Sequence, residues 1–190
     1  MGDAAEDRAE ARQLPEGDVI RILLEQHAQV RDLFAEIQQA PAGDRQEPFD
    51  RLRALLAVHE TAEELVLRPQ ADGSEWKDVA TERNNEEAEA NEMLAGLERM
   101  DTATEGFLAK LQEFEKSVDE HAEAEESQEF PRVLDALDED ERRKLGSRLR
   151  AVEKMAPTHP HPTAAGSTTA VALTGPFAAM VDRVKDALSA

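Results

Sequence analysis

The feature that most constrains the fold is a set of apolar stripes at helical spacing. In three segments, apolar residues recur in alternating steps of three and four, as they do on one face of an α-helix packed against other helices. One such stripe contains Phe107, Leu111, Phe114 and Val118. The chain has no Tyr, a single Trp and 4% aromatic residues, against 34% charged residues, a balance typical of long solvated helices rather than strands. The sequence therefore predicts an all-α protein.

Prolines, glycines and N-capping residues divide the chain into helices and connecting segments. Residues 1–17 are polar, lack periodicity and end in Pro15 and Gly17, which predicts a flexible lead-in with Asp18 as the N-cap of the first helix. The expected helices cover 18–39, 46–68, 75–100 and 102–130, with a shorter helix over 138–155. Four helices of similar length joined by short loops predict a four-helix bundle within 18–155.

Two signals mark the end of this domain. The fourth helix is expected to end at Pro131, and Asp138 with Glu141 forms a capping box that starts the shorter helix. Residues 156–190 are expected to form a Pro-, Thr- and Ala-rich linker followed by a short amphipathic helix. The predicted fold is thus an all-α, up-down-up-down four-helix bundle with an additional C-terminal helix and a flexible tail.

The charge of the chain limits its partners. The formal net charge is -20, from 42 Asp+Glu against 22 Lys+Arg, so nucleic acids and anionic membranes are not expected to bind it. The absence of Cys excludes disulfides, thiolate metal sites and Cys nucleophiles. The first residues contain no apolar leader and no later run is long enough to span a bilayer, so a cytoplasmic location is expected.

Ionisable residues interrupt the apolar stripes at one level of the predicted bundle. The first stripe contains His27, and the second contains His59 and Glu63. The stripe of the fourth helix continues into His121 and Glu125. An unpartnered buried carboxylate costs several kcal/mol, a large part of the stability of about 5–15 kcal/mol of a whole domain. Either water enters the bundle at this level or a cation balances the acids, and a metal ion does so most completely because imidazole nitrogen and carboxylate oxygen are metal ligands.

A repeated string supports the metal hypothesis. The segments HETAEELVLRP, 59–69, and HAEAEESQEFP, 121–131, share a His, Glu at the fourth and fifth following positions, and Pro at the tenth. They are 62 residues apart, as expected for two copies of one helical hairpin. A His and a Glu four residues apart lie on one face of a helix and can approach the same ion or two neighbouring ions.

These motifs resemble the hemerythrin-like, or HHE cation-binding, family over about residues 18–135. That family has a His in the first helix, His-x-x-x-Glu in the second, a His in the third and His-x-x-x-Glu in the fourth. The matching residues here are His27, His59, Glu63, His121 and Glu125. The resemblance implies a non-haem di-iron centre in which Glu63 and Glu125 bridge the irons and the three His are terminal ligands. It also makes Glu60 a candidate ligand.

The third helix departs from this pattern. It reads ERNNEEAEANEML, with Asn85 at the position expected for a His. An Asn carbonyl is a weak replacement for imidazole at iron. A carboxylate on the same helix could fill the vacancy, with Glu89 as the first choice and Glu86 as the second. Alternatively the position is open to water, or the second metal is bound weakly or is absent.

Two functions from different classes follow from these motifs. The first is a di-iron protein that binds or processes O2, NO or peroxide, or that senses iron or oxygen status; whether it is an enzyme stays open. The second is a helical stress-response or interaction scaffold whose metal site has degenerated at Asn85. Zinc accepts the same ligand set, so iron is favoured by the resemblance alone. No pattern in the sequence indicates a pocket for an organic molecule.

Overall fold

A computed structural model of the chain describes residues 2–71 and 77–155, and the linker and terminal helix expected in 156–190 lie outside this part. The described residues form α-helices joined by short 3₁₀ and π-helical segments, without a strand. In chain order they are α1 (Ala4–Ala11), α2 (Val19–Gln39), η1 (Ala42–Asp44), α3 (Gln46–Ala62), η2 (Glu63–Leu67), η3 (Arg68–Ala71), α4 (Lys77–Leu97), α5 (Glu105–Ala124), η4 (Glu125–Glu129), α6 (Phe130–Ala136) and α7 (Glu139–Met155). None of these helices is apolar over a length that would cross a bilayer.

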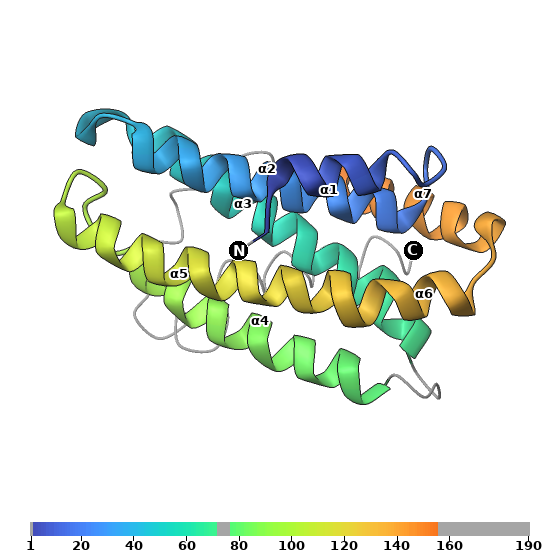
Figure 1. Ribbon diagram of the computed structural model, residues 1–190. Helices are drawn as coiled ribbons and strands as arrows, with labels where there is room; N and C mark the ends of the chain where they lie inside the picture. Colours follow the sequence, from blue (N-terminus) through green and yellow to red (C-terminus); the bar gives the residue numbers. More distant parts are fainter. Residues whose placement is uncertain (1, 72–76, 156–190) are drawn as a thin grey trace.

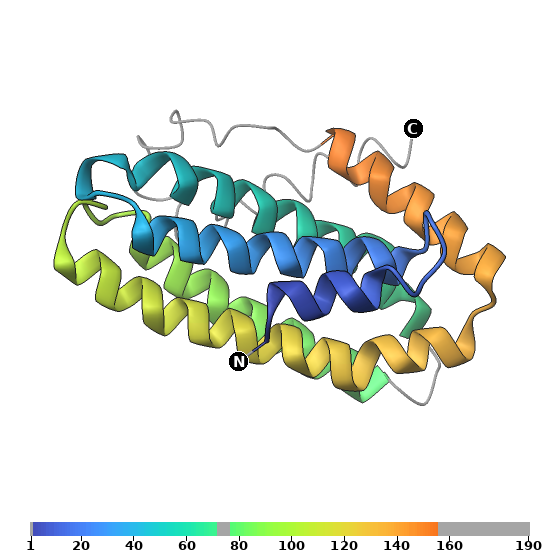
Figure 2. The same ribbon diagram turned by 45° about the horizontal axis from the view of Figure 1, so that its top comes forward.

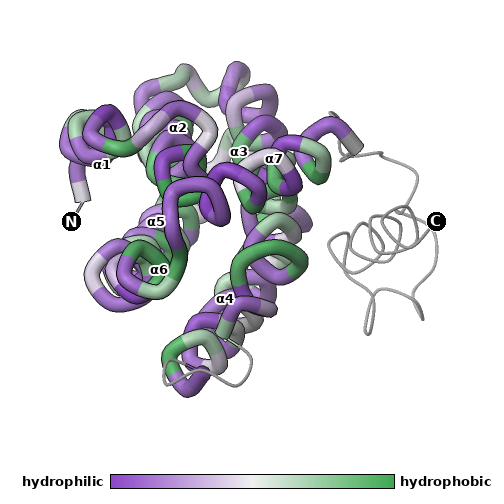
Figure 3. The backbone as a smooth tube through the Cα atoms, turned by 90° about the vertical axis from the view of Figure 1, so that its right-hand side faces the viewer, coloured by the Kyte–Doolittle hydropathy of each residue, from purple (hydrophilic) through white to green (hydrophobic). Residues whose placement is uncertain are grey.

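The helices α2, α3, α4 and α5 form an up-down-up-down bundle, which confirms the predicted all-α class. Figures 1 and 2 show α2 beside α3 in one layer and α4 beside α5 in the other. The end-on view in Figure 3 places α1 on the outer side of α2. Helix α7 packs back against both α2 and α3. The long helices therefore surround one interior, and α1 and α7 cover it from outside.

The N-terminal segment contains a helix where the sequence predicted a flexible lead-in. Asp3 caps α1 by accepting a hydrogen bond from the backbone N–H of Ala5 at 2.8 Å. The buried Asp7 pairs with Arg31 of α2, and Ala11 packs into the apolar core. The expectation was wrong because α1 is held to α2 largely by charged side chains, which apolar periodicity does not reveal.

The helical path also continues beyond Pro131. Helix α5 passes through the π-helical turn η4 into α6, which ends at Ala136. Pro131 lies in the first turn of α6, where the missing backbone N–H breaks no intrahelical hydrogen bond. The predicted helix end at Pro131 is therefore wrong, because the helical path continues through α6 to Ala136.

Helix α7 begins at the predicted capping box. The backbone N–H of Asp138 donates to the carboxylate of Glu141, and the backbone N–H of Glu141 donates to Asp138 Oδ1, both at 2.9 Å. Arg142 then donates from Nε to Asp18, the N-cap of α2, at 2.7 Å. Gly146 allows the close approach to the first loop, because an added Cβ would lie 2.0 Å from the carbonyl oxygen of Gly17.

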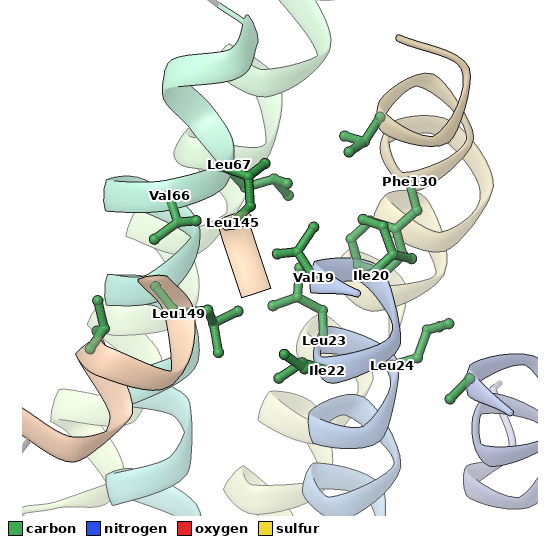
Figure 4. Close-up of a cluster of buried hydrophobic side chains, with 14 of the residues drawn as sticks. Val19, Ile20, Ile22, Leu23, Leu24, Val66, Leu67, Phe130, Leu145 and Leu149 are labelled. Carbon is green, nitrogen blue, oxygen red and sulfur yellow. The ribbon is translucent and has the colours of Figure 1, made fainter. Parts of the chain in front are cut away.

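Two apolar clusters lie on either side of the ionisable layer. The first cluster joins α2 to η2, α6 and α7, and Figure 4 shows its central side chains. These include Val19, Ile20, Leu23, Val66, Leu67, Phe130, Leu145 and Leu149. The second cluster joins the other ends of α2 and α3 to α4 and α5 around Phe34, Phe49, Phe107 and Phe114. On α2 and α3 the His residue lies between the segments that supply the two clusters. His121 lies between the second-cluster residues of α5 and Phe130 of α6, so an apolar cluster lies on each side of the polar layer.

Candidate metal centre

The polar layer brings together side chains from three helices of the bundle. His27 of α2 and His59 of α3 have ring centroids 4.9 Å apart. The ligand atoms of His27, His59 and Glu125 all lie within 4.8 Å of one another. His121 of α5 lies on the other side of Glu125, with Nε2 3.2 Å from Glu125 Oε1. The three His residues that the sequence singled out thus lie around a common carboxylate.

The converging ligand atoms form two adjoining groups. The first contains His27, His59 and Glu125, and the second contains Glu63, Glu87, His121 and Glu125. Within the second group too, one ligand atom from each residue lies within 4.8 Å of all the others. Glu125 belongs to both groups and has no exposed surface. The two groups of donors therefore adjoin each other and share one carboxylate.

The two repeated strings share a local backbone conformation. Glu63 is the first residue of the π-helical turn η2, and Glu125 is the first residue of η4. Each therefore follows its His by one α-helical turn and stands where the helix widens. π-helical turns occur frequently at functional sites, because the extra residue in the turn changes the direction of the side chains around it. The sequence repeat is consequently also a structural repeat.

Each His is oriented by a hydrogen bond from its Nδ1 to a side chain outside the two groups. The acceptor is Glu126 for His27 at 2.7 Å, Gln26 for His59 at 2.9 Å and Glu86 for His121 at 2.9 Å. The Nε2 atoms are therefore directed toward the buried carboxylates. Such outer hydrogen bonds fix the tautomer and the ring orientation of metal-binding His residues in proteins.

Several buried atoms of the site have no hydrogen-bond partner among the residues that the structure describes. They are His27 Nε2, His121 Nε2, Glu63 Oε1, Glu63 Oε2 and Glu125 Oε2. Buried polar groups in folded proteins are almost always hydrogen-bonded, so a cluster of exceptions requires an explanation. Imidazole Nε2 and carboxylate oxygen are donors that suit both iron and zinc. The unpartnered atoms are thus the ones that a metal ion would bind, and the residues present fit such an ion.

A buried arginine accompanies the carboxylates, although no pattern in the sequence indicated it. Arg68 donates from Nη1 to both oxygens of Glu129, at 2.5 and 2.6 Å. Its Nη2 donates to Glu125 Oε1 at 3.1 Å and pairs with Glu87. In the repeat, Arg68 corresponds to Phe130 of the second string, so the two halves of the site differ here. The guanidinium supplies one positive charge to an acidic layer.

The surroundings shift the pKa values of the His residues in opposite directions. Burial, reinforced by the charge of His27, lowers the pKa of His59 to about 3, so this imidazole is neutral. Burial alone would also lower the pKa of His121, but the Glu125 and Glu86 carboxylates raise it to about 9. The pKa of His27 is raised in the same way, since Glu125 and Glu126 outweigh its burial.

The two buried glutamates at the starts of the π-helical turns also differ. Burial and the neighbouring charge of Glu125 raise the pKa of Glu63 well above its ordinary value. Burial acts on Glu125 in the same direction, but His121, His27 and Arg68 hold its pKa well below the ordinary value. The surroundings therefore favour the charged form of Glu125 and the neutral form of Glu63.

The third long helix contributes a different residue from those expected. Asn85, the position that the family pattern assigns to a His, and Glu89, the favoured replacement, both lie on the exposed face of α4. Glu87 instead lies in the second group of ligand atoms, and Glu86 acts as the acceptor for His121 Nδ1. A backward count could have found Glu87, since the buried positions Leu97, Leu94 and Ala90 continue to it in steps of three and four.

Glu60 lies next to the centre without joining it. Among the described residues, neither group of converging ligand atoms includes its carboxylate. It accepts a hydrogen bond from Asn91 Nδ2 at 3.0 Å. Burial and the charge of Glu87 raise the pKa of Glu60 to about 8. A carboxyl group in this state can hold a proton at neutral pH beside the candidate metal ligands.

A cavity adjoins the layer, although no sequence pattern indicated a pocket for an organic molecule. Its volume is about 860 Å³, and His27, His59, Glu60, Glu87 and His121 line its inner end. The three candidate His ligands are therefore reachable from a space inside the bundle. A small molecule that enters this space would meet them directly.

A helical bundle with two groups of imidazole and carboxylate donors around a shared glutamate defines a metal-binding helical protein. Comparison with known proteins identifies which one: the sequence profile of the hemerythrin HHE cation-binding domain matches residues 18–133, and the chain belongs to this family. The matched segment starts at the N-cap of α2 and therefore leaves α1 outside.

One similar protein is an uncharacterized hemerythrin-like protein of the fission yeast Schizosaccharomyces pombe. It is 31% identical over 134 residues, which cover 69% of this chain and 66% of the relative. The chain thus spans just under two thirds of that relative's length. No solved structure matches the chain significantly.

Proposed function

We propose that this protein holds two non-haem iron ions in the polar layer and uses them to bind or process O2, NO or peroxide. The first ion would be held by His27, His59 and Glu125, and the second by Glu63, Glu87, His121 and Glu125. Two iron ions would supply redox chemistry and an open coordination position for a small ligand. Iron rather than zinc follows from the family, because the donor set suits both metals.

The observation that carries this proposal is the position of Glu125. Its carboxylate lies between the Nε2 atoms of His27, at 3.3 Å, and His121, at 3.2 Å. It is fully buried and is shared by both groups of ligand atoms. A carboxylate placed between two sets of donors is the usual way in which a helical bundle holds a pair of metal ions.

The protein's own residues would control the chemistry in three ways. The hydrogen bonds at Nδ1 keep the imidazoles aimed inward, and Arg68 limits the negative charge of the layer. The protonated carboxyl of Glu60 could deliver a proton to a ligand that enters from the cavity. The apolar clusters on both sides restrict water around the donors.

The test is the metal content of protein produced with ferrous iron. Two irons per chain and a near-ultraviolet absorption band of an oxo-bridged ferric pair are expected. Zinc in place of iron, or one metal per chain, would contradict the di-iron assignment. Exposure of the reduced protein to O2, NO and peroxide, followed by absorption spectroscopy, then distinguishes the ligands.

One observation favours the alternative of a helical scaffold without metal. Arg68 contacts Glu87, Glu125 and Glu129, so a cation already balances part of the acidic layer. If this balance were sufficient, a chelator would leave the thermal stability unchanged and the chain would contain no metal. A loss of stability in chelator would exclude this alternative.

A further inference from the structure

The cavity beside the polar layer is much larger than the small ligands of the proposed function need. Its volume is about 860 Å³, whereas a water molecule occupies roughly 30 Å³ of liquid and a diatomic gas needs a comparable space. Cavities of about 300–1,000 Å³ with mainly apolar walls are those that bind organic molecules in proteins. A cavity of this size therefore fits a ligand larger than O2, NO or peroxide.

The cavity is elongated along the bundle. On α5 its wall runs from Gln112 to Glu123, which is about 16 Å at the helical rise of 1.5 Å per residue. On α2 it runs from His27 to Ala35, about 12 Å. One end thus meets the His residues, and the other end lies further along the bundle, away from the polar layer.

The walls between these ends are apolar and come from all four long helices. Val30 and Phe34 of α2, Leu56 of α3, Ala90 of α4 and Val118 of α5 supply them. Ala90 and Val118 are small, and the second apolar cluster does not fill the space beside them. An apolar body placed here would be removed from water at about 25 cal/mol per Å² of its surface.

Charged residues around the cavity determine which polar groups it accepts. Its lining includes the acids Asp3, Asp32, Glu115, Asp119, Glu120 and Glu123. The basic residues of the lining are Arg31 and Lys116. Arg31 is already paired with Asp7, Asp119 and Glu126, and Lys116 with Glu120. These pairs also neutralise Asp119 and Glu120 of the lining, but its acids still outnumber its bases. The excess of negative charge would repel an anionic group and favour a neutral or cationic one.

We propose that this cavity is a binding site for an elongated, mainly apolar organic molecule whose polar end is neutral or cationic. The apolar body lies against Val30, Phe34 and Leu56, and its far end approaches the three His residues. The polar group lies beside the carboxylates of α5, which line the cavity from Glu115 to Glu123. Delivery of such a molecule to a metal rests on the proposed function, whereas binding in the cavity does not.

The test uses the full chain and the neutral fluorescent dye Nile red. The dye is expected to bind with one site per chain and to be displaced by decylamine and decanol. Decanoate is expected to need a concentration roughly tenfold higher, because the carboxylates repel it. Displacement by decanoate as readily as by decylamine would overturn the proposed charge preference, and absence of saturable dye binding would overturn the site.

Variants that fill the cavity locate the dye. Val118→Phe and Ala90→Leu are expected to weaken dye binding at least about tenfold, because they occupy the apolar space. Val79→Phe is the matched control, since Val79 is half-buried on α4 and does not line the cavity. Helical circular dichroism shows which variants are folded. Wild-type binding by a folded Val118→Phe or Ala90→Leu chain would contradict the proposal.

The same titration on metal-free and iron-loaded protein separates the two hypotheses. Dye binding by a chain that takes up no iron would overturn the proposed function and support the cavity site. Two irons per chain without dye binding would support the proposed function and overturn the cavity site.

Discussion

Arg68 of η3 forms a two-pronged ion pair with Glu129 of η4, its Nη1 lying 2.5 and 2.6 Å from the two carboxylate oxygens. The pair joins the ends of the two repeated strings, and the other guanidinium nitrogen reaches Glu125. One arginine therefore links the two π-helical turns from which Glu63 and Glu125 extend. It provides the positive charge that the layer needs before any metal binds.

Replacement of Arg68 by Met should destabilise the metal-free protein strongly. Removal of one partner from a buried ion pair costs about 3–5 kcal/mol, because it leaves carboxylates without compensation. The free energy of unfolding in urea measures this loss, and iron should reduce it by balancing the same acids. Arg51→Met is the control, since Arg51 pairs with Glu36 in solvent and should cost less than about 1 kcal/mol. Equal losses in both variants would contradict this role of Arg68.

The sequence predicted the bundle because its apolar stripes are regular on three helices. It also predicted that His27, His59, Glu63, His121 and Glu125 would converge, since each replaces an apolar residue in a stripe. Whether they bind metal stays a prediction. The apolar residues of the stripes, and the positions at which His and Glu interrupt them, can be read from the sequence alone.

The features that the sequence did not predict depend on interactions that do not recur at a regular spacing along the chain. Helix α1 is held by Asp7 and Arg31, a pair of charges 24 residues apart. On α4 the inward positions Arg83 and Glu87 are charged, so apolar spacing did not identify the face of this helix that reaches the polar layer. The position of Arg68 beside Glu129 depends on the π-helical turns, which a spacing of 3.6 residues does not anticipate.

Substitution of Glu87 and substitution of Glu125 should remove different numbers of metal ions. Glu125→Gln should reduce the iron content from two per chain to nearly none, because this carboxylate belongs to both groups. Glu87→Gln should leave one, because it belongs to the second group only. Elemental analysis of the purified variants measures this. Glu89→Gln, on the exposed face of α4, should keep two irons, and a loss there would favour the ligand assigned from the sequence.

Gln26 should affect metal affinity without binding metal. Its side-chain oxygen accepts from His59 Nδ1, and its Nε2 donates to Glu153 of α7 at 2.9 Å. Loss of such an outer hydrogen bond typically reduces metal affinity by roughly 10–100-fold. Competition with a chelator would measure the change for Gln26→Ala. Gln29→Ala, exposed on the same helix, should behave like the wild type.

His121 should make the stability of the metal-free protein depend on pH. Its pKa is raised from an ordinary 6.5 to about 9, so the folded state binds the proton more tightly. The resulting stabilisation, roughly 3 kcal/mol at most, is fully present below pH 6.5 and is lost as the pH rises through 9. Urea unfolding between these pH values should show this decrease. His121→Asn should show a smaller one, and an unchanged slope would assign the effect to other groups.

Crystals of the iron-loaded protein, measured above and below the iron absorption edge, test the central claim most directly. We predict two anomalous peaks in the polar layer, one near the Nε2 atoms of His27 and His59 and one near Nε2 of His121, with Glu125 beside both. Peaks confined to surface carboxylates, or a layer without a peak in which Arg68 alone contacts the acids, would contradict it.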